Sequence, residues 1–279
     1  MSETLTPSAG TGPDAGGAPA APALLSRDVA YEHEGTRLLG FLAAPAEPGL
    51  RRGAPVLLFH DAFGLTPLVQ GIAERLAERG HAVFAADVWG DRTQPTSQEA
   101  IGPLIGSIVG DRRRWLGRVA AAHAAAAAQE EFGDRAPVAL GYCFGGSSAL
   151  EHLRTGGELA GVIAIHAGLD LLEEDWSGRT ADAAVLVCSG FEDPMATREQ
   201  REALAGHLSE AGLDWELDLY SRTVHAFTSP AAAHSPNKAV VDYNPRSAQR
   251  SWEATLRFLA ATHPGHPTSS GTSAPATGG

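Results

Sequence analysis

The sequence predicts an α/β fold with a mostly parallel central sheet and helices on both faces. Short apolar segments alternate along the chain with longer segments of helical pattern, and this alternation is typical of parallel strands joined by helices. A glycine-rich turn, residues 141–146, joins one such strand to one such helix. Polar side chains follow several of the predicted strands, and ligands of open α/β sheets bind beyond the carboxyl ends of the strands.

The individual elements follow in chain order. A hairpin is predicted over residues 28–42, with its turn at Glu34 and Gly35. Strands are predicted at residues 55–59, 81–87, 137–140, 161–165, 183–190 and 215–220. Helices are predicted at residues 67–79, 111–132, 145–153, 198–211 and 247–262. In the first helix Ile72 and Leu76 share one face, and the alanine run 124–128 lets the second helix pack closely on the sheet.

Cys143 is the candidate nucleophile. It stands in residues 141–146, which have the form Gly-x-Cys-x-Gly of a sharp strand-to-helix turn. The glycines let strand and helix approach closely, and the turn leaves the central side chain exposed at the sheet edge. The helix N-terminus favours the thiolate, which is the nucleophilic form of cysteine. The alternative is a small buried cysteine in a glycine-rich turn; the flanking strand and helix favour the nucleophile.

Two further side chains complete a candidate triad in the chain order nucleophile, acid, histidine. Asp193 follows a predicted strand and is fixed in a turn by Pro194, and His225 lies in the loop after the last predicted strand. In this interpretation His225 takes the thiol proton or pairs with the thiolate, and Asp193 orients the ring. Glu192 is the alternative acid, and Asp-Pro is also a common turn pair, but the stiff backbone at Pro194 favours Asp193.

An oxyanion hole for this nucleophile needs two backbone donors. One is the N–H of the residue after the nucleophile, here Phe144. The other comes from the loop after the strand 55–59, where the N–H of Ala62 is the first candidate and that of Phe63 the second. With these donors Cys143 can attack an acyl carbon and form a thioester that water then cleaves.

Four segments together resemble the signature motifs of the dienelactone hydrolase family, also called carboxymethylenebutenolidase-like. They are residues 60–65, 141–146, 190–194 and 224–227, and residues 243–252 are similar as well. The resemblance covers about residues 28–262. It implies a single-domain α/β-hydrolase fold, a Cys-His-Asp triad, no metal, no cofactor, and hydrolysis of a lactone or an ester.

The resemblance also implies an acidic residue near the thiol that helps to convert the cysteine into its thiolate. Asp61 matches this position, where family members usually have the longer Glu; its alternative role is to cap the following helix. Members that act on dienelactone hold its carboxylate with arginines, one of them four residues beyond the histidine. Ser229 matches that position and cannot pair with a carboxylate, so the natural substrate stays open. Arg222 and the arginines 112–114 are other candidates.

Aromatic residues next to the candidate site predict an apolar substrate pocket. Phe63 and Phe227 flank the candidate catalytic positions, and Trp89 and His166 each follow a predicted strand at the same edge of the sheet. Trp89 and His166 also have simpler interpretations. The tryptophan can pack a loop, and the histidine can be a hydrogen-bonded residue at a strand end.

The charge of the chain argues against nucleic acid or a membrane as a partner. The chain has 33 acidic and 21 basic residues, a formal net charge of −12, and such a surface repels phosphates. We therefore expect a small-molecule substrate. No apolar stretch is long enough for a membrane helix, and no secretory signal is expected. Cys188, in an apolar strand, is predicted to be inert, and a reducing cytoplasm suits the free Cys143.

The two ends of the chain are predicted to be disordered. Residues 1–26 and 264–279 are rich in Ala, Gly, Pro, Ser and Thr, which leaves residues 27–263 as one domain. The oligomeric state is open, with a monomer as the simplest expectation. Besides a hydrolase, an acyltransferase, a thioesterase or a non-catalytic metabolite-binding protein can use the same scaffold, and the intact triad favours catalysis.

Overall fold

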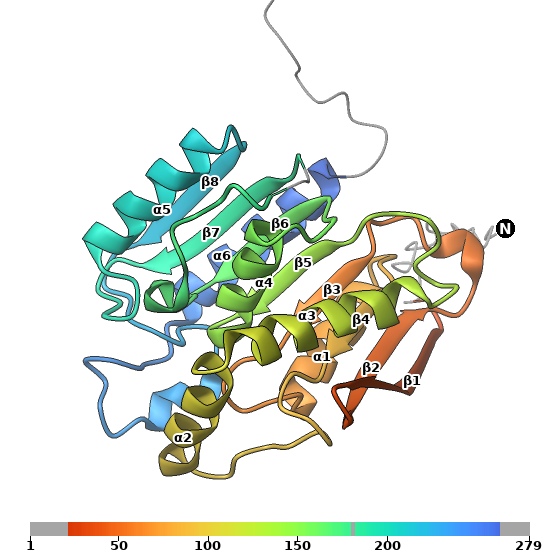
Figure 1. Cartoon of the computed structure of the whole chain (residues 1–279), viewed down its shortest axis with the longest axis horizontal. Coiled ribbons are helices and arrows are strands. Elements are labelled where there is room, and N and C mark those ends of the chain that lie inside the picture. The colour runs from red at the N-terminus through yellow and green to blue at the C-terminus, as the bar shows by residue number, and fades with distance from the viewer. Residues whose placement is uncertain (1–21, 180–181, 263–279) are drawn as a thin grey trace, which may run out of the picture.

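An eight-stranded sheet forms the centre of the structure, a computed structural model that describes residues 22–179 and 182–262 (Figure 1). The strands are β1 (Leu24–His33), β2 (Thr36–Pro45), β3 (Val56–Phe59), β4 (Val83–Ala86), β5 (Val138–Tyr142), β6 (Gly161–Ile165), β7 (Ala184–Gly190) and β8 (Trp215–Tyr220). They lie in the order β1-β2-β4-β3-β5-β6-β7-β8. The pairs β1–β2 and β2–β4 are antiparallel and the other pairs are parallel, which confirms the predicted mostly parallel sheet.

Helices cover both faces of this sheet. They are α1 (Pro67–Ala77), α2 (Gln98–Val109), α3 (Arg112–Ala127), α4 (Phe144–Arg154), α5 (Arg198–Glu210) and α6 (Pro245–Ala261), with short 3-10 helices η1 (Pro48–Leu50), η2 (Leu169–Leu171) and η3 (Pro230–His234). In Figure 1, α3, α4 and α5 lie in front of the sheet, and α1 and α6 lie behind it. Helix α2 packs on α3 rather than on the sheet.

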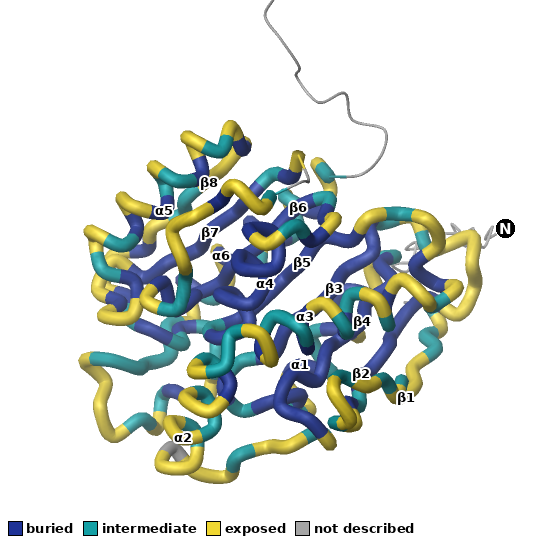
Figure 2. Tube along the Cα trace, viewed as in Figure 1, coloured by how far each residue is buried: buried dark blue, intermediate teal, exposed yellow. Residues whose placement is uncertain are grey.

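The apolar core is divided into two clusters, one on each face of the sheet. Leu57 belongs to the front cluster, with Trp115 of α3, whereas the next residue, Leu58, belongs to the rear cluster, with Leu76 of α1. Successive residues of a strand point to opposite faces, so a strand that is buried on both faces is apolar at every position. Figure 2 shows the central strands buried along their length.

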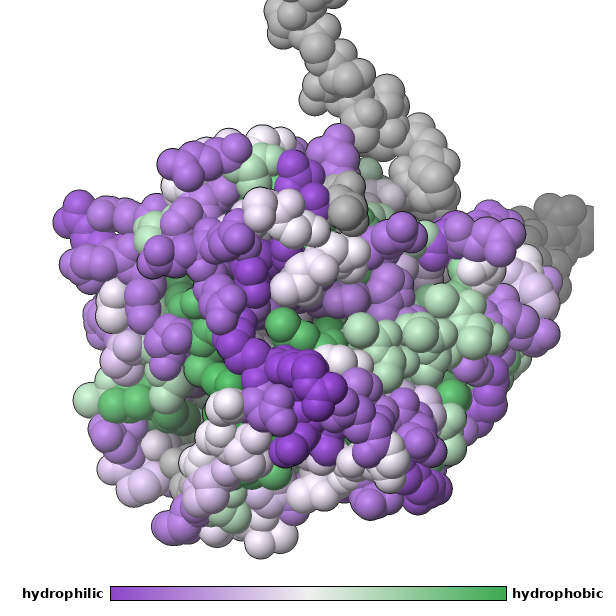
Figure 3. Space-filling model, viewed as in Figure 1, coloured by the Kyte–Doolittle hydropathy of each residue, from purple (hydrophilic) through white to green (hydrophobic). Residues whose placement is uncertain are grey.

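The outer surface of α3 is divided between two kinds of side chain (Figure 3). Hydrophilic side chains gather over the start of the helix, which carries arginines 112–114, and hydrophobic ones gather over its alanine-rich second half. Helix α3 packs against β1. Of the alanine run 124–128, Ala126 is buried, whereas Ala124, Ala127 and Ala128 are exposed, so only one face of the run packs closely.

The structure differs from the predicted elements at several boundaries. Strand β1 begins at Leu24, before residue 27, the predicted start of the domain, because Leu24 pairs with Pro45 of β2. Helix α3 ends at Ala127 rather than at residue 132, since the chain turns before Gly133, which has a φ of +59°. The remainder of the predicted disordered ends, residues 1–21 and 264–279, lies outside the described residues.

Helix α2 was not among the predicted elements. It contains Gly102, Pro103 and Gly106, and glycine and proline are poor helix formers in helix interiors. Its apolar residues pack against the front cluster. This tertiary packing outweighs the weak local propensity.

A pair of histidines lies between α3 and α4. His123 Nδ1 and His152 Nε2 are 2.8 Å apart, so one nitrogen donates a proton to the other. Burial lowers the pKa of His152 to about 3, and the neighbouring His123 adds to this shift. Burial also lowers the pKa of His123. The folded protein therefore keeps both rings neutral.

We expect the free energy of unfolding to fall as the pH decreases from about 6.5 toward 4. Above the ordinary histidine pKa both states are neutral, whereas below it the unfolded chain binds protons that the folded state excludes. One such histidine contributes a slope of about 1.4 kcal/mol per pH unit. Urea unfolding of wild type and His152→Gln across this range measures the slope, and we expect the variant to be less pH-sensitive. His234→Gln, at an exposed histidine, is the control; equal slopes in wild type and His152→Gln would contradict this account.

Candidate active site

The carboxyl ends of β3, β5, β6, β7 and β8 meet at one edge of the sheet, because these neighbouring strands are parallel. A predicted site residue follows each of them: Asp61, Cys143, His166, Asp193 and His225. The topology thus brings together residues that are far apart in the sequence.

The turn that carries Cys143 is tightly packed. Cys143 precedes α4 with a φ of +54° and a ψ of −121°, a conformation that residues other than glycine rarely adopt. A Cβ on Gly141 would lie 2.0 Å from the Gly145 oxygen, and one on Gly145 would lie 2.4 Å from the Phe59 oxygen. Only glycine allows β5, α4 and the end of β3 to approach this closely.

The His225 ring lies within hydrogen-bonding distance of both Cys143 and Asp193. His225 Nε2 is 3.1 Å from Cys143 Sγ, and His225 Nδ1 is 2.9 Å from Asp193 Oδ2. The N–H of Met195 donates to Asp193 Oδ1 at 2.8 Å. Asp193 and His225 are buried, whereas Cys143 is partly exposed, so the sulfur is the accessible end of this chain of contacts. Glu192, the alternative acid, is exposed.

The surroundings of His225 favour its charged form. Burial alone would lower the pKa of His225, but the Cys143 sulfur and the Asp193 carboxylate outweigh burial and raise this pKa to about 10. The backbone is fixed as well, since the His225 N–H donates to the Val240 oxygen at 3.1 Å. The ring is therefore held as an imidazolium between a sulfur and a carboxylate.

A candidate oxyanion hole is formed by backbone N–H groups, one from the loop after β3 and one from the start of α4. The N–H of Phe63, the second candidate, donates to Asp61 Oδ1 at 2.9 Å and is therefore engaged. Within the described residues, the N–H groups of Ala62 and Phe144 have no hydrogen-bond acceptor. The structure thus favours Ala62 over Phe63 as the partner of Phe144.

His60 fixes this loop and was missed by the sequence analysis. Its Nδ1–H donates to the Asp61 oxygen at 2.7 Å, and its Nε2 accepts the N–H of Val88 at 3.1 Å. Burial lowers the pKa of His60, in agreement with the neutral ring that this pattern requires. The available signal was a polar residue, His60, directly after an apolar strand. Its partner Val88, just after β4, is distant in sequence and could not be inferred.

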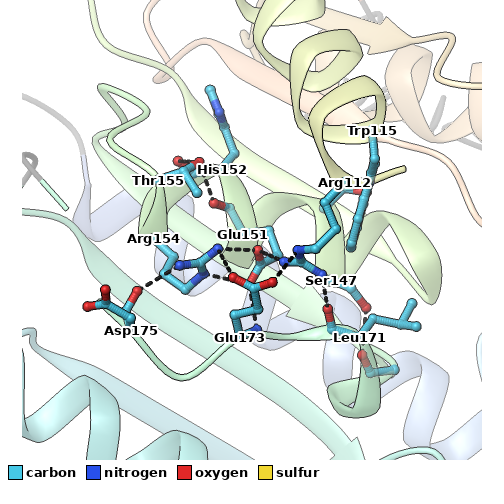
Figure 4. A network of polar contacts seen from close by, with 12 residues as sticks. Arg112, Trp115, Ser147, Glu151, His152, Arg154, Thr155, Leu171, Glu173 and Asp175 are labelled. Atoms are coloured by element: carbon cyan, nitrogen blue, oxygen red, sulfur yellow. Dashed lines mark hydrogen bonds and ion pairs between the residues drawn. The ribbon is translucent and has the colours of Figure 1, made fainter. Parts of the chain in front are cut away.

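A buried carboxylate, Glu151, fixes α4 to its neighbours (Figure 4). Glu151 forms ion pairs with Arg154 of the same helix, at 2.8 Å, and with Arg112 at the start of α3. It also accepts the N–H of Glu173, from the segment after η2, at 3.0 Å. Because α4 begins directly after Cys143, this network fixes the orientation of the helix that presents the sulfur.

Comparison with known proteins identifies the family. The sequence model of the dienelactone hydrolase family matches residues 38–263. The chain belongs to this family. It is 24% identical over 212 residues to a carboxymethylenebutenolidase homologue of Yersinia pestis, an alignment that covers 73% of this chain and 76% of that protein.

Solved structures of dienelactone hydrolases share the fold. The structure named m3DLH is 34% identical with a TM-score of 0.79. A dienelactone hydrolase-like promiscuous phosphotriesterase from metagenomic libraries is 31% identical with a TM-score of 0.77. Each comparison covers 86% of this chain and 99% of the other. The predicted α/β-hydrolase fold is confirmed, and the family supports hydrolysis of an ester or lactone.

Asp61 differs in length from the glutamate usual in dienelactone hydrolases. Burial raises the pKa of Asp61, and the Phe63 N–H and the positive charge of His225 partly offset this effect. No hydrogen bond joins Asp61 to Cys143 among the described residues. The carboxylate instead closes the turn to Phe63 and lines a neighbouring cavity.

This cavity, with a volume of about 250 Å³, lies between α1 and α6. Its wall includes Asp61, Arg75, Tyr142, Thr228, Ser229 and Trp252. None of the four predicted pocket residues lines it.

Three of the four predicted pocket residues are buried behind the site instead. Trp89 stacks on Phe144, with ring centroids 4.5 Å apart. Phe227 is fully buried against His166, and the ring centroids are 5.1 Å apart. These three rings therefore do not form the wall of the cavity. Phe63 is partly buried and belongs to neither core cluster.

The arginines that the sequence suggested for a substrate carboxylate lie elsewhere. Arg112 pairs with Glu151, Arg113 with Glu34 and Arg114 with Asp111. Arg222 is exposed and does not line the cavity.

In residues 22–179 and 182–262, no three His, Cys, Asp or Glu side chains gather in a group that could hold a metal ion. The described helices include none with the length and apolar character needed to cross a bilayer.

We expect iodoacetamide to label Cys143 and spare Cys188 in the folded protein. Both cysteines are free, but Cys188 is fully buried, and burial raises its pKa to about 12, which suppresses the reactive thiolate. Peptide mass spectrometry after labelling at pH 8 checks this selectivity, and labelling in urea should modify both thiols. Equal labelling of both in the folded protein would rule out the difference in accessibility.

Proposed function

We propose that this member of the dienelactone hydrolase family cleaves a small-molecule ester or lactone with Cys143 as its nucleophile. The main support is the continuous contact from Cys143 Sγ through the His225 ring to the buried Asp193 carboxylate, at 3.1 Å and 2.9 Å. A protein that only binds a metabolite has no need of a nucleophile aligned with a base and an acid.

In the first step, the Cys143 thiolate attacks the carbonyl carbon. The carbonyl oxygen becomes negative and is stabilised by the N–H groups of Ala62 and Phe144. The carbon–oxygen bond of the ester then breaks, and the leaving oxygen takes a proton from the His225 imidazolium. In a lactone, the leaving hydroxyl stays attached to the acyl chain, so nothing departs until the second step.

In the second step, water cleaves the thioester. Neutral His225 removes a proton from the water as it attacks the acyl carbon, and the carbon–sulfur bond breaks. The products are a carboxylic acid and the restored pair of thiolate and imidazolium. Asp193 accepts the N–H of His225 Nδ1 in both steps and keeps Nε2 directed at the sulfur.

Asp61 is the proposed thiol-activating carboxylate. Its raised pKa makes it a stronger base than an exposed aspartate, so it can take the proton of a Cys143 thiol when His225 already carries one, which leaves the same pair of thiolate and imidazolium. A reducing compartment such as the cytoplasm would keep this thiol free. The proposed partner is the small-molecule substrate.

The principal alternative is transfer of the acyl group to a nucleophile other than water. An acyltransferase, a thioesterase and an ester hydrolase share the same acyl-enzyme. A panel of p-nitrophenyl esters, lactones, dienelactone and acyl thioesters distinguishes them, and a phosphotriester belongs in it because a similar structure is described as a promiscuous phosphotriesterase. Intact-mass detection of an acyl adduct on Cys143 identifies the intermediate.

We expect Cys143→Ala to abolish ester or lactone cleavage, because alanine has no nucleophile. The matched variant Cys188→Ala should keep near-normal turnover, since Cys188 lies in the rear core cluster, on the opposite face from the cluster that Cys143 packs against. Steady-state kinetics on the best substrate of the panel makes the comparison. Equal loss of activity in the two variants would refute the assignment.

We expect Asp193→Asn to lower turnover strongly and Glu192→Gln to leave it nearly unchanged. Asparagine cannot stabilise the imidazolium, and in serine triads the corresponding change lowers kcat by about four orders of magnitude; a cysteine nucleophile should lose less. Circular dichroism of both variants controls for misfolding. A larger loss in Glu192→Gln would move the acid role to Glu192.

A further inference from the structure

The turn between β7 and α5, which carries Asp193, is held from two sides. On the side of β8, the N–H of Glu192 donates to the Thr223 oxygen at 3.0 Å. This bond ties the turn to the segment that leads to His225. On the side of α5, the turn meets a buried arginine, Arg201. The position of the Asp193 carboxylate relative to His225 therefore depends on both neighbours.

The Arg201 guanidinium donates to three carbonyl oxygens of this turn. Its Nη1 donates to the oxygen of Gly190, at 3.2 Å, and to that of Ala196. Its Nη2 donates to the Phe191 oxygen at 3.5 Å. These carbonyls stand on both sides of Asp193 in the sequence, so one planar group with several donors spans the whole turn.

The start of α5 determines where Arg201 points. Thr197 and Gln200 form a capping box: the Gln200 N–H donates to Thr197 Oγ1 at 3.3 Å, and the Thr197 N–H donates to Gln200 Oε1 at 2.8 Å. Arg201 is the next residue, one turn into the helix. Because helical side chains lean toward the N-terminus of their helix, its guanidinium reaches back to the segment before α5.

Arg201 is a buried cation without an ion pair. Among the described residues, its guanidinium has carbonyl oxygens as partners and no carboxylate within ion-pair distance. Burial lowers the pKa of Arg201, and the negative charge of Asp193 is the largest influence that opposes this shift. A buried charge is unfavourable unless other groups compensate it. The guanidinium and the carboxylate therefore stabilise each other across the turn.

Four groups thus alternate in charge along one row. The guanidinium of Arg201 is positive, the carboxylate of Asp193 is negative, and the imidazolium of His225 is positive. When Cys143 is a thiolate, it forms the negative end, in contact with the His225 ring. Arg201, Asp193 and His225 are all buried. Without the guanidinium, this row would have a net negative charge where water cannot screen it.

We propose that Arg201 is a positioning residue for catalysis, which holds the turn of Asp193 and balances the charge of its carboxylate so that the carboxylate stays aligned with His225. The inference rests on the proposed function, because the alignment of Asp193 matters only if His225 serves Cys143. Arg201 does not line the cavity between α1 and α6, so it acts through Asp193 and not on the substrate.

Steady-state kinetics of Arg201→Met and Arg201→Lys tests this role. Methionine keeps an apolar stem but has no charge and no donor. We expect Arg201→Met to lower kcat by about tenfold or more, since a misplacement of about 1 Å in an active site can cost about a hundredfold. KM should change by less than about twofold, because the lost interaction acts on the transition state. Arg201→Lys should recover part of the loss, since it restores the charge but not the planar fork.

Arg198→Met is the matched control. Arg198 is exposed on the same helix and pairs with Glu202, so its loss should leave kcat and KM unchanged. Circular dichroism of every variant controls for misfolding. An unchanged kcat in folded Arg201→Met would overturn the proposal.

The same substitution in the Asp193→Asn background separates positioning from general destabilisation. If Arg201 acts through the carboxylate, Arg201→Met should lower kcat there by less than about twofold, because residues that act as a unit are not additive. A change that only loosens the fold lowers kcat by the same factor in both backgrounds, and this result would rule out the positioning role. If Arg201→Met does not fold, Arg201→Lys in the two backgrounds gives the same comparison.

Alkylation of Cys143 distinguishes this inference from the proposed function. The rate with iodoacetamide near neutral pH depends on the thiolate and needs no substrate. We expect Arg201→Met to lower this rate, but not in the Asp193→Asn background. Equal rates in wild type and Arg201→Met overturn the role of Arg201 even if Cys143 proves to be the nucleophile. Conversely, the expected rates in a protein that cleaves no ester or lactone would refute the hydrolase and leave the row of charges intact.

Discussion

The close backbone contact around Gly145 is the constraint on which the site depends. The carbonyl oxygens of Phe59 and His60 lie 2.4 and 2.5 Å from the place where a Cβ on Gly145 would stand. This contact brings the end of β3, and with it the loop that carries Ala62, against the start of α4. Cys143 occupies the residue before that helix with a positive φ, so the candidate nucleophile and both candidate oxyanion donors come from segments in direct contact.

The sequence predicted the sheet and the contacts of His225 with Cys143 and Asp193 well, because each of them depends on a short local sequence pattern. Each strand is a short apolar run, and Cys143, Asp193 and His225 each follow such a run, so the parallel topology brings them together. The cavity had no such signal. Arg75 and Trp252 belong to helices far apart in the sequence, and their contact depends on how α1 and α6 pack behind the sheet. For the same reason, Trp89 and Phe227, which were expected in the pocket because they stand near the motifs, are core residues.

Two adjacent histidines show how partners decide protonation in a buried site. His225 and His166 have ring centroids 5.3 Å apart, and both are nearly fully buried. His225 has a sulfur and a carboxylate as partners, which raise its pKa against the effect of burial. Among the described residues, the polar partner of the His166 ring is the hydroxyl of Thr228, so burial and the charge of His225 keep it neutral. The same side chain is thus suited to give up a proton at one position and to hold a fixed hydrogen bond at the other.

Aromatic packing positions one of the two candidate oxyanion donors. Phe144 is stacked between Trp89 and Trp115, with centroids 4.5 and 5.3 Å away, so these rings hold the residue whose N–H is a candidate oxyanion donor. The cavity wall is mixed: it has the hydroxyls of Tyr142 and Thr228, but also the apolar side chains of Ile72 and Trp252. Apolar contacts discriminate weakly between substrates that differ by a methylene, whereas a polar group that a bound substrate leaves unpaired costs binding free energy. The polar groups of this wall are therefore the ones that can distinguish between substrates.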